Sequence, residues 1–185
     1  PPTRPPPHGG RARRGPAKPR RGPSPEARAL NEEIKAARFA DELLAIFRRT
    51  DRERVDYFQT ATLWSRLGRV SRKPLRADSV QDLVEHTIDT LPSSGARGVT
   101  NILHGAAKAG LRGRDAAALY EAGEAAARRV MREMAPQALS NTAWAFATAE
   151  HAAPALFDAL AAEVVPRLGE FDPQNLSNTA WAFAK

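Results

Sequence analysis

The chain has 185 residues, no cysteine and a formal net charge of +7 at pH 7. Without cysteine, disulfide bonds, thiolate metal sites and cysteine nucleophiles are excluded, and because no apolar run approaches about 18 residues we expect no membrane span. The excess charge is local: residues 1–25 hold seven basic side chains and no acidic one, whereas the remainder holds 21 of each sign. Overall basicity therefore does not by itself indicate a nucleic-acid-binding domain.

The first 25 residues are rich in proline and arginine. They lack the apolar side chains that would offset the entropy of ordering, so we expect a disordered tail. Its arginines and its lack of acidic residues fit an organellar transit peptide and fit a basic linker equally well.

The segment that follows predicts two helices. Ser24 and Pro25 are typical of a helix start, and the apolar residues from Glu26 to Arg49 recur at helical spacing, which predicts one long helix, either straight or bent. Thr50 and Glu53 form a capping-box pattern that predicts a second helix running to about Gly68. Nine basic and three acidic residues between positions 44 and 76 indicate either a phosphate-binding surface or a solvated helix face.

The rest of the chain also has the periodicity of helices. Ser79 and Asp82 predict a helix that runs to about Leu91, Gly110 predicts the end of another, and Asp172 predicts the start of the last. No segment alternates between apolar and polar residues as a strand does, so the sequence predicts an all-α fold. The remaining helices are expected at 97–109, 114–134, 137–149, 154–168 and 173–185.

One stretch is repeated. The sequence PQALSNTAWAFAT at 136–148 returns 37 residues later as PQNLSNTAWAFAK, with 11 of 13 positions identical. We call this stretch the repeat word. Weaker forms at 61–69 and 101–109 place Trp64, His104 and Trp144 at a spacing of 40. Recurrence at such a period predicts an α-solenoid of helical hairpin repeats, with a period of 37 to 40 residues, over residues 26–185.

The expected repeat-word helices lie near 53–68, 97–109, 137–149 and 173–185. Because the chain begins without methionine and ends inside a repeat word, we expect it to be part of a longer protein. The helical period places Leu139, Ala143, Phe146 and Ala147 on a core face. An outer stripe is expected on the opposite side, formed by Ala138, Asn141, Ala145 and Thr148 and, in the next word, by Asn175, Asn178, Ala182 and Lys185.

The repeat words resemble the octotricopeptide-type repeats of algal and plant organellar proteins. They also resemble the repeats of FAST-kinase-like proteins and of the kinetoplastid RNA-editing substrate-binding complex. The resemblance covers residues 30–185 and is most specific in the last 50 or so. It implies single-stranded RNA binding in a mitochondrion or chloroplast, in the processing, stability, editing or translation of transcripts, with other organellar RNA-processing proteins as further partners.

Candidate RNA-binding residues are the positions at which the words differ, since a repeat array reads its ligand with side chains that vary on a constant scaffold. Lys108 and Lys185 are expected to meet phosphates, and Asn175 a base edge. The alternative is that these exposed positions vary because nothing constrains them. The full set of varying positions is Gly98, Lys108, Ala138, Thr148, Asn175 and Lys185.

Three asparagines recur at one column of the words, namely Asn101, Asn141 and Asn178. Asparagine is mildly unfavourable inside a helix, so we expect these side chains to have a partner. The partner is either the backbone of the adjacent repeat or an extended ligand, such as an RNA backbone or a peptide. The aromatic residues of the neighbouring column, His104, Trp144 and Trp181, are expected to pack between repeats.

The sequence contains no recognisable catalytic constellation. Its four histidines lack metal-ligand spacing, and no phosphate-cradling glycine loop or nucleophile elbow is present. We therefore expect no enzyme activity and no cofactor, metal or small-molecule substrate. The alternative function is an α-solenoid protein-interaction scaffold that binds an extended peptide.

Overall fold

The computed structural model describes residues 24–111 and 114–185, and within these ranges every regular element is a helix. The expected all-α fold class is thereby confirmed. The expected disordered tail lies outside the described residues, apart from Ser24 and Pro25. In chain order the α-helices of the described ranges are α1 (Pro25–Ala36), α2 (Ala40–Arg49), α3 (Tyr57–Val70), α4 (Ala77–Thr90), α5 (Ala96–Lys108), α6 (Arg114–Val130), α7 (Pro136–Thr148), α8 (Pro154–Val164) and α9 (Pro173–Ala184).

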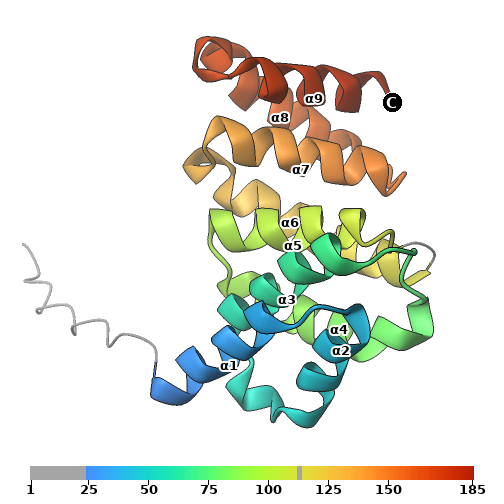
Figure 1. Ribbon diagram of the computed structural model, residues 1–185. Coiled ribbons are helices and arrows are strands. Elements are labelled where there is room, and N and C mark those ends of the chain that lie inside the picture. Colours follow the sequence, from blue (N-terminus) through green and yellow to red (C-terminus); the bar gives the residue numbers. More distant parts are fainter. Residues whose placement is uncertain (1–23, 112–113) are drawn as a thin grey trace, which may run out of the picture.

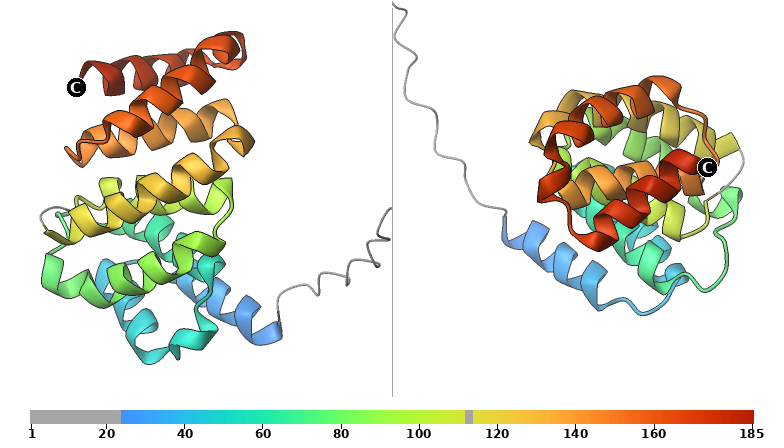
Figure 2. Two further views of the ribbon diagram at one scale, coloured as in Figure 1. Left: turned by 180° about the vertical axis from the view of Figure 1, so that it is seen from behind. Right: turned by 90° about the horizontal axis from the view of Figure 1, so that it is seen from above.

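The helices form two layers. Helices α3, α5, α7 and α9 pack side by side in chain order in one layer, and α4, α6 and α8 form the other. Figure 1 shows α5, α7 and α9 one above another, with α1 at the bottom of the stack and the C-terminus at the top, and Figure 2 (left) shows the second layer from behind. The core lies between the layers, where the expected core-face residues Leu139, Ala143 and Phe146 are fully buried and Ala147 is half-buried.

The long helix expected at 26–49 is wrong, because the chain leaves the helical conformation between α1 and α2. The Glu42 carboxylate accepts hydrogen bonds from the backbone N–H groups of Arg38 (2.7 Å) and Phe39 (3.4 Å), which starts a new helix. The break also frees the carbonyl of Ala37, to which Arg66 donates at 2.6 Å. Apolar residues continue at helical spacing through this break, so their periodicity could not reveal it.

Helix α3 begins at Tyr57, four residues later than expected. The Asp56 carboxylate accepts from the N–H groups of Phe58 (2.7 Å) and Gln59 (3.3 Å), while the Gln59 amide oxygen accepts from the Asp56 N–H (3.2 Å). This reciprocal pair is a capping box. The box expected at Thr50 does not form, because the Thr50 hydroxyl donates to the Ile46 carbonyl at the end of α2.

Three partner helices differ from expectation at their ends. Helix α4 starts at Ala77 rather than after Ser79, whose hydroxyl donates to the Arg76 carbonyl instead of capping. Helices α6 and α8 both end in 3₁₀ segments, at 131–133 and 165–170, so they are shorter than predicted. By contrast, Ser24 and Asp172 cap α1 and α9 as expected, each accepting from an N–H of the first turn.

Arginine side chains close two of the hairpins. Arg129, near the end of α6, donates to the carbonyls of Leu91 (3.2 Å) and Ser94 (2.7 Å) in the turn before α5. Arg167, just after α8, donates to the carbonyl of Met134 (3.1 Å) in the turn before α7. In both hairpins, α5–α6 and α7–α8, an arginine near the end of the second helix thus donates to carbonyls in the turn before the first helix. We call this contact the arginine clip.

Helices α5 and α7 also end in the same way. After α5, the N–H groups of Gly110 and Leu111 donate to carbonyls three and five residues earlier, which is a Schellman motif. After α7, Glu150 and His151 make the same two bonds. Gly110 has a φ of 70°, as expected of a helix C-cap glycine, but Glu150 adopts a φ of 55° with a side chain.

Replacing Glu150 with glycine should stabilise the protein by about 1 kcal/mol, because the left-handed conformation crowds a β-carbon against the backbone. The free energy of unfolding measured in urea tests this. The matched control is Glu150→Ala, which removes the same charge from the helix C-terminus but keeps the β-carbon. Equal stability of the two variants would contradict the assignment of the gain to backbone strain.

Small residues face the neighbouring helix along the first layer. Gly105, Ala145 and Ala182 occupy one column of the repeat word, and all three are buried. At Gly105 the approach is closest, since a β-carbon there would lie 2.5 Å from the carbonyl carbon of Trp64. Small residues at such a seam let helix backbones approach, so the layer is held together by close packing along this column.

The expected outer stripe is therefore partly wrong. Ala145, Asn175 and Ala182 are buried, although the helical wheel placed them opposite the core. The reason is that a helix inside a stack is covered on three sides, by the second layer and by the helices before and after it. One edge of the expected outer stripe faces the preceding repeat-word helix in the layer. Only the other edge of the stripe reaches solvent.

Candidate nucleic-acid interface

The solvent-facing edge of the first layer is formed by four positions of each repeat-word helix. They follow one another at intervals of four, three and four residues, so the helical period places them on one face. All are exposed or half-buried. We call this surface the outer ridge, and its members are Arg97, Asn101, His104 and Lys108 on α5, Gln137, Asn141, Trp144 and Thr148 on α7, and Gln174, Asn178, Trp181 and Lys185 on and directly after α9.

Helix α3 also contributes to the outer ridge. Its residues correspond to those of α5 in a register that differs from the sequence alignment. Trp64 is fully buried and its indole N–H donates to the Thr87 hydroxyl at 2.8 Å, so it does not share a column with His104 and Trp144. It corresponds instead to the buried Leu103 of α5, at a spacing of 39 residues. The α3 residues that continue the outer ridge are Phe58, Thr62, Ser65 and Arg69.

The asparagine row lies on this ridge. Asn101 is exposed, and Asn141 and Asn178 are half-buried. None of the three side-chain amides has a hydrogen-bond partner among the described residues, so the expected bond to an adjacent backbone is not made. Each amide offers two donors and an acceptor. The row therefore presents repeated, unused hydrogen-bonding groups to solvent.

Asn175, expected to contact a base edge, lies elsewhere. The residue is only 8% exposed. Its backbone N–H donates to the Asp172 carboxylate (2.7 Å), and its carbonyl accepts from the Ser140 hydroxyl of α7 (3.0 Å). Asn175 thus lies in the seam between α7 and α9 and is not part of the outer ridge.

The structure brings several other predicted residues together in shallow grooves. Asn101, Ala138 and Asn141 line the groove between α5 and α7, beside Arg97 and Gln137. A second groove lies between α3 and α5 and is lined by Gly98, Asn101 and Arg97, together with the aromatic rings of Tyr57 and Phe58. The two grooves share Ala96, Arg97, Asn101 and the acidic Glu133, so they are adjacent along the ridge.

The outer ridge is basic where α3 and α5 end. Lys108 lies against the end of α3, because a β-carbon on Gly68 would be 3.0 Å from the β-carbon of Lys108. The loop after α3 is held on the end of α5 by a hydrogen bond from the Leu75 N–H to the Ala109 carbonyl (3.0 Å). Exposed cations with no ion pair to any described side chain gather here, namely Arg69, Arg72, Lys73, Arg76 and Lys108.

Of the five other arginines of the basic segment, all but Arg54 have structural contacts, including the bond from Arg66 to the Ala37 carbonyl. Arg48 donates to the Ser79 carbonyl, Arg49 pairs with Glu33, and Arg52 pairs with Asp82. The segment therefore matches neither reading throughout. Its first half binds the protein itself, and its cations from Arg69 to Arg76 face solvent with no ion pair to any described side chain.

Aromatic rings form the middle column of the ridge. The centroids of His104 and Trp144 are 5.1 Å apart, and those of Trp144 and Trp181 are 6.5 Å apart. Burial, followed by the charge of Lys108, lowers the pKa of His104, so the imidazole is neutral near pH 7. Sequence reasoning assigned these rings to packing and missed their exposure. The available signal was their place on the same helix face as Asn141 and Thr148.

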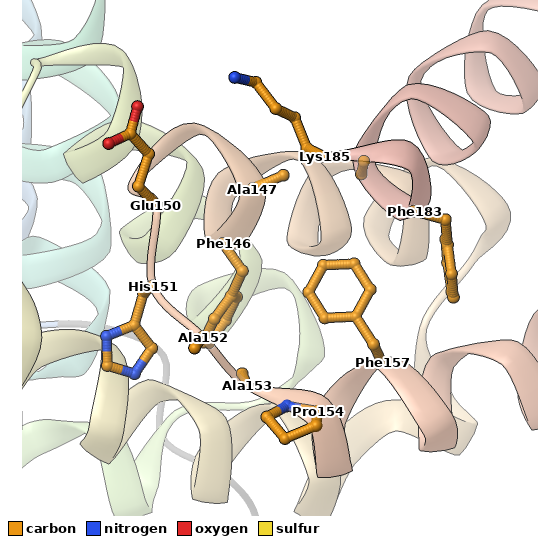
Figure 3. A pocket seen from close by; sticks show the side chains of 11 residues that line it. Phe146, Ala147, Glu150, His151, Ala152, Ala153, Pro154, Phe157, Phe183 and Lys185 are labelled. Atoms are coloured by element: carbon orange, nitrogen blue, oxygen red, sulfur yellow. The ribbon is translucent and has the colours of Figure 1, made fainter.

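An apolar groove lies beside the last helix, α9. It lies where α7, α8 and α9 meet and is lined by Phe146, Phe157, Phe183 and Pro154, with Glu150 and Lys185 at its margin (Figure 3). The rings of Phe157 and Phe183 meet edge to face at 5.1 Å. Of these lining residues only Lys185 belongs to the ridge, so the groove is a separate surface.

No protein-family model and no curated protein matches the sequence. Within residues 24–111 and 114–185, no helix combines the length and the apolar character needed to cross a membrane. A function is therefore inferred from the chemistry of the outer ridge and from the resemblance of the repeat word.

Proposed function

We propose that the protein is an α-solenoid of helical hairpin repeats that binds single-stranded RNA along the outer ridge. The repeat character is supported by α5 and α7, whose buried and exposed positions follow the same pattern at a spacing of 40 residues. It is also supported by their shared Schellman ends and arginine clips. Helical repeats of this kind stack into extended surfaces on which equivalent side chains recur.

The observation that carries the proposal is the ridge itself. Amide groups without partners lie in one row, and cations without partners lie beside it at the ends of the same helices. Lysine and arginine neutralise phosphates, whereas amides donate to and accept from base edges. Lys108 and Lys185 would hold phosphates, and Asn101, Asn141 and Asn178 would contact bases or sugars.

The biological setting follows from the resemblance of the repeat word. It supports a role in the processing, stability, editing or translation of transcripts in a mitochondrion or chloroplast. We infer a binding protein rather than an enzyme, with no cofactor, because the ridge offers no group poised for acid, base or nucleophilic chemistry.

A peptide-binding scaffold is the second candidate, and one observation favours it. A row of unpartnered asparagines at equal intervals can hydrogen-bond to the backbone of an extended peptide as well as to a nucleic acid. The basic end of the ridge separates the two candidates, because a peptide backbone has no phosphate charge to neutralise.

Salt dependence of RNA binding tests the proposal. The full chain should bind random single-stranded RNA with an affinity that falls steeply with salt, and the double variant Arg69→Gln, Lys108→Gln should lower the logarithmic slope by about 1.4, or about 0.7 per lost phosphate contact. Fluorescence anisotropy at four salt concentrations measures this. The control is Arg128→Gln with Lys35→Gln, which removes the same charge from ion-paired side chains on α6 and α1. Equal slopes for the two double variants would place the RNA elsewhere, and no binding by the full chain would favour the scaffold.

A further inference from the structure

We propose that His104, Trp144 and Trp181 form a platform on which unpaired nucleobases stack. This inference rests on the proposed RNA binding and adds how the RNA is bound, namely by contact of its bases with the faces and edges of the three rings. The ligand chemistry is that of a single strand with accessible bases, not of a duplex.

Exposure of the rings is the first support. Trp181 is 43% exposed on α9, but α9 has a first-layer neighbour on one side only. Trp144 is the better test, because α5 and α9 cover α7 on both sides and Trp144 is still half-buried. Trp64 shows what a packing tryptophan looks like in this protein, since it is fully buried and its N–H is bonded to Thr87. Neither Trp144 nor Trp181 donates its N–H to any described residue.

The neighbours of each ring are the second support. On each helix the ring lies three residues after an asparagine of the ridge and four residues before its last ridge position. Side chains at these intervals are adjacent on a helix surface. A base stacked on Trp181 therefore has the Asn178 amide at one side and the Lys185 ammonium at the other, which suits a base edge and a phosphate.

The spacing of the rings is the third support. Their centroids are 5.1 and 6.5 Å apart, whereas nucleotides of one strand in a helix rise by about 3.4 Å. Rings at these distances, tilted by 58° and 32°, pack against one another, so no base can insert between them. A strand with one base on the outer side of each ring must be stretched beyond helical stacking, and its bases then exchange contact with one another for contact with the aromatic side chains, as in sequence-tolerant single-strand binders.

His104 contributes a neutral ring to the same platform. Its burial and the nearby Lys108 lower its pKa, so it stacks as an uncharged heteroaromatic ring while the lysine supplies the charge. The two functions, stacking and phosphate binding, are thereby divided between adjacent side chains of α5.

The test compares two probes of equal charge on the full chain. One is a twelve-nucleotide oligouridine, and the other is a sugar-phosphate oligomer of the same length without bases. We expect the oligouridine to bind more tightly and to quench tryptophan fluorescence, and Trp181→Leu to weaken it by about 5- to 150-fold per stacked base lost. Trp144→Leu should act in the same direction. Neither change should alter binding of the abasic probe.

Phe183→Leu is the matched control, because Phe183 is an equally exposed aromatic residue of α9 that lies off the ridge. It should leave both affinities unchanged. If Trp144→Leu impairs folding, as judged by circular dichroism, the result for Trp181→Leu alone decides, since Trp181 is exposed and Trp144 is half-buried. Equal binding of both probes with no effect of Trp181→Leu would overturn the stacking platform and leave phosphate-directed RNA binding intact. Binding of neither probe would overturn RNA binding itself.

Discussion

Replacing Gly105 with valine is expected to destabilise the protein by about 3 kcal/mol. A β-carbon at this position would lie 2.5 Å from the carbonyl carbon of Trp64 and 2.9 Å from the backbone nitrogen of Ser65. These atoms belong to the backbone of α3 and cannot rotate away as a flexible side chain can. The only relief is separation of α3 from α5, which opens gaps in the tightly packed seam between them.

Thermal unfolding followed by circular dichroism measures this effect, and for a chain of this size about 3 kcal/mol corresponds to a fall in Tm of about 6–12 °C. Gly169→Val is the control, because a β-carbon at Gly169 meets no atom within 4 Å. Its Tm should stay within about 2 °C of the parent. A Gly105→Val protein as stable as the control would show that α3 and α5 do not approach as described.

Phe146→Ala is expected to cost about 3–5 kcal/mol, whereas Phe183→Ala should cost less than about 1 kcal/mol. The two phenylalanines hold the same place in the repeat word, 37 residues apart. Phe146 is fully buried and packs against the ring of Tyr120 at 5.0 Å, whereas Phe183 is 44% exposed. Second-layer helices cover the core face of α7, whereas on α9 Phe183 meets Phe157 of α8 edge to face and stays exposed.

The free energies of unfolding of the two variants, obtained from urea titrations with a shared slope, give the comparison directly. Each variant controls for the other, since the substitution and the local sequence are the same. Equal losses for Phe146 and Phe183 would mean that both rings are buried to the same degree, contrary to the structure.

Helix content and several helix starts could be predicted because they depend on local chemistry. The period of Leu139, Ala143 and Phe146 shows in the sequence which face is buried, and the side chains of Ser24 and Asp172 cap residues only three positions away. The repeat word also identified two of these helices, α7 and α9, from the sequence. Such features need no knowledge of the distant chain.

Features set by distant contacts could not be predicted in this way. The register of α3 depends on the close approach of Gly105, some 40 residues later in the chain, which leaves Trp64 inside rather than on the ridge. The outer stripe was misplaced for a similar reason, since the helical wheel does not show that Ala145 and Ala182 meet a neighbouring helix. The exposed aromatic rings were missed because tryptophan in a repeat is usually a packing residue.

The arginine clips bear on the order of folding. Arg129 and Ser94, and likewise Arg167 and Met134, are 35 and 33 residues apart in the chain. Each hairpin can therefore close its open end with its own residues before any neighbour is in place, and the entropy lost on closing so short a loop is modest. Folding can begin in a single clipped hairpin and spread to the adjacent one through the small-residue seam, because each helix contacts mainly the helices next to it in the two layers.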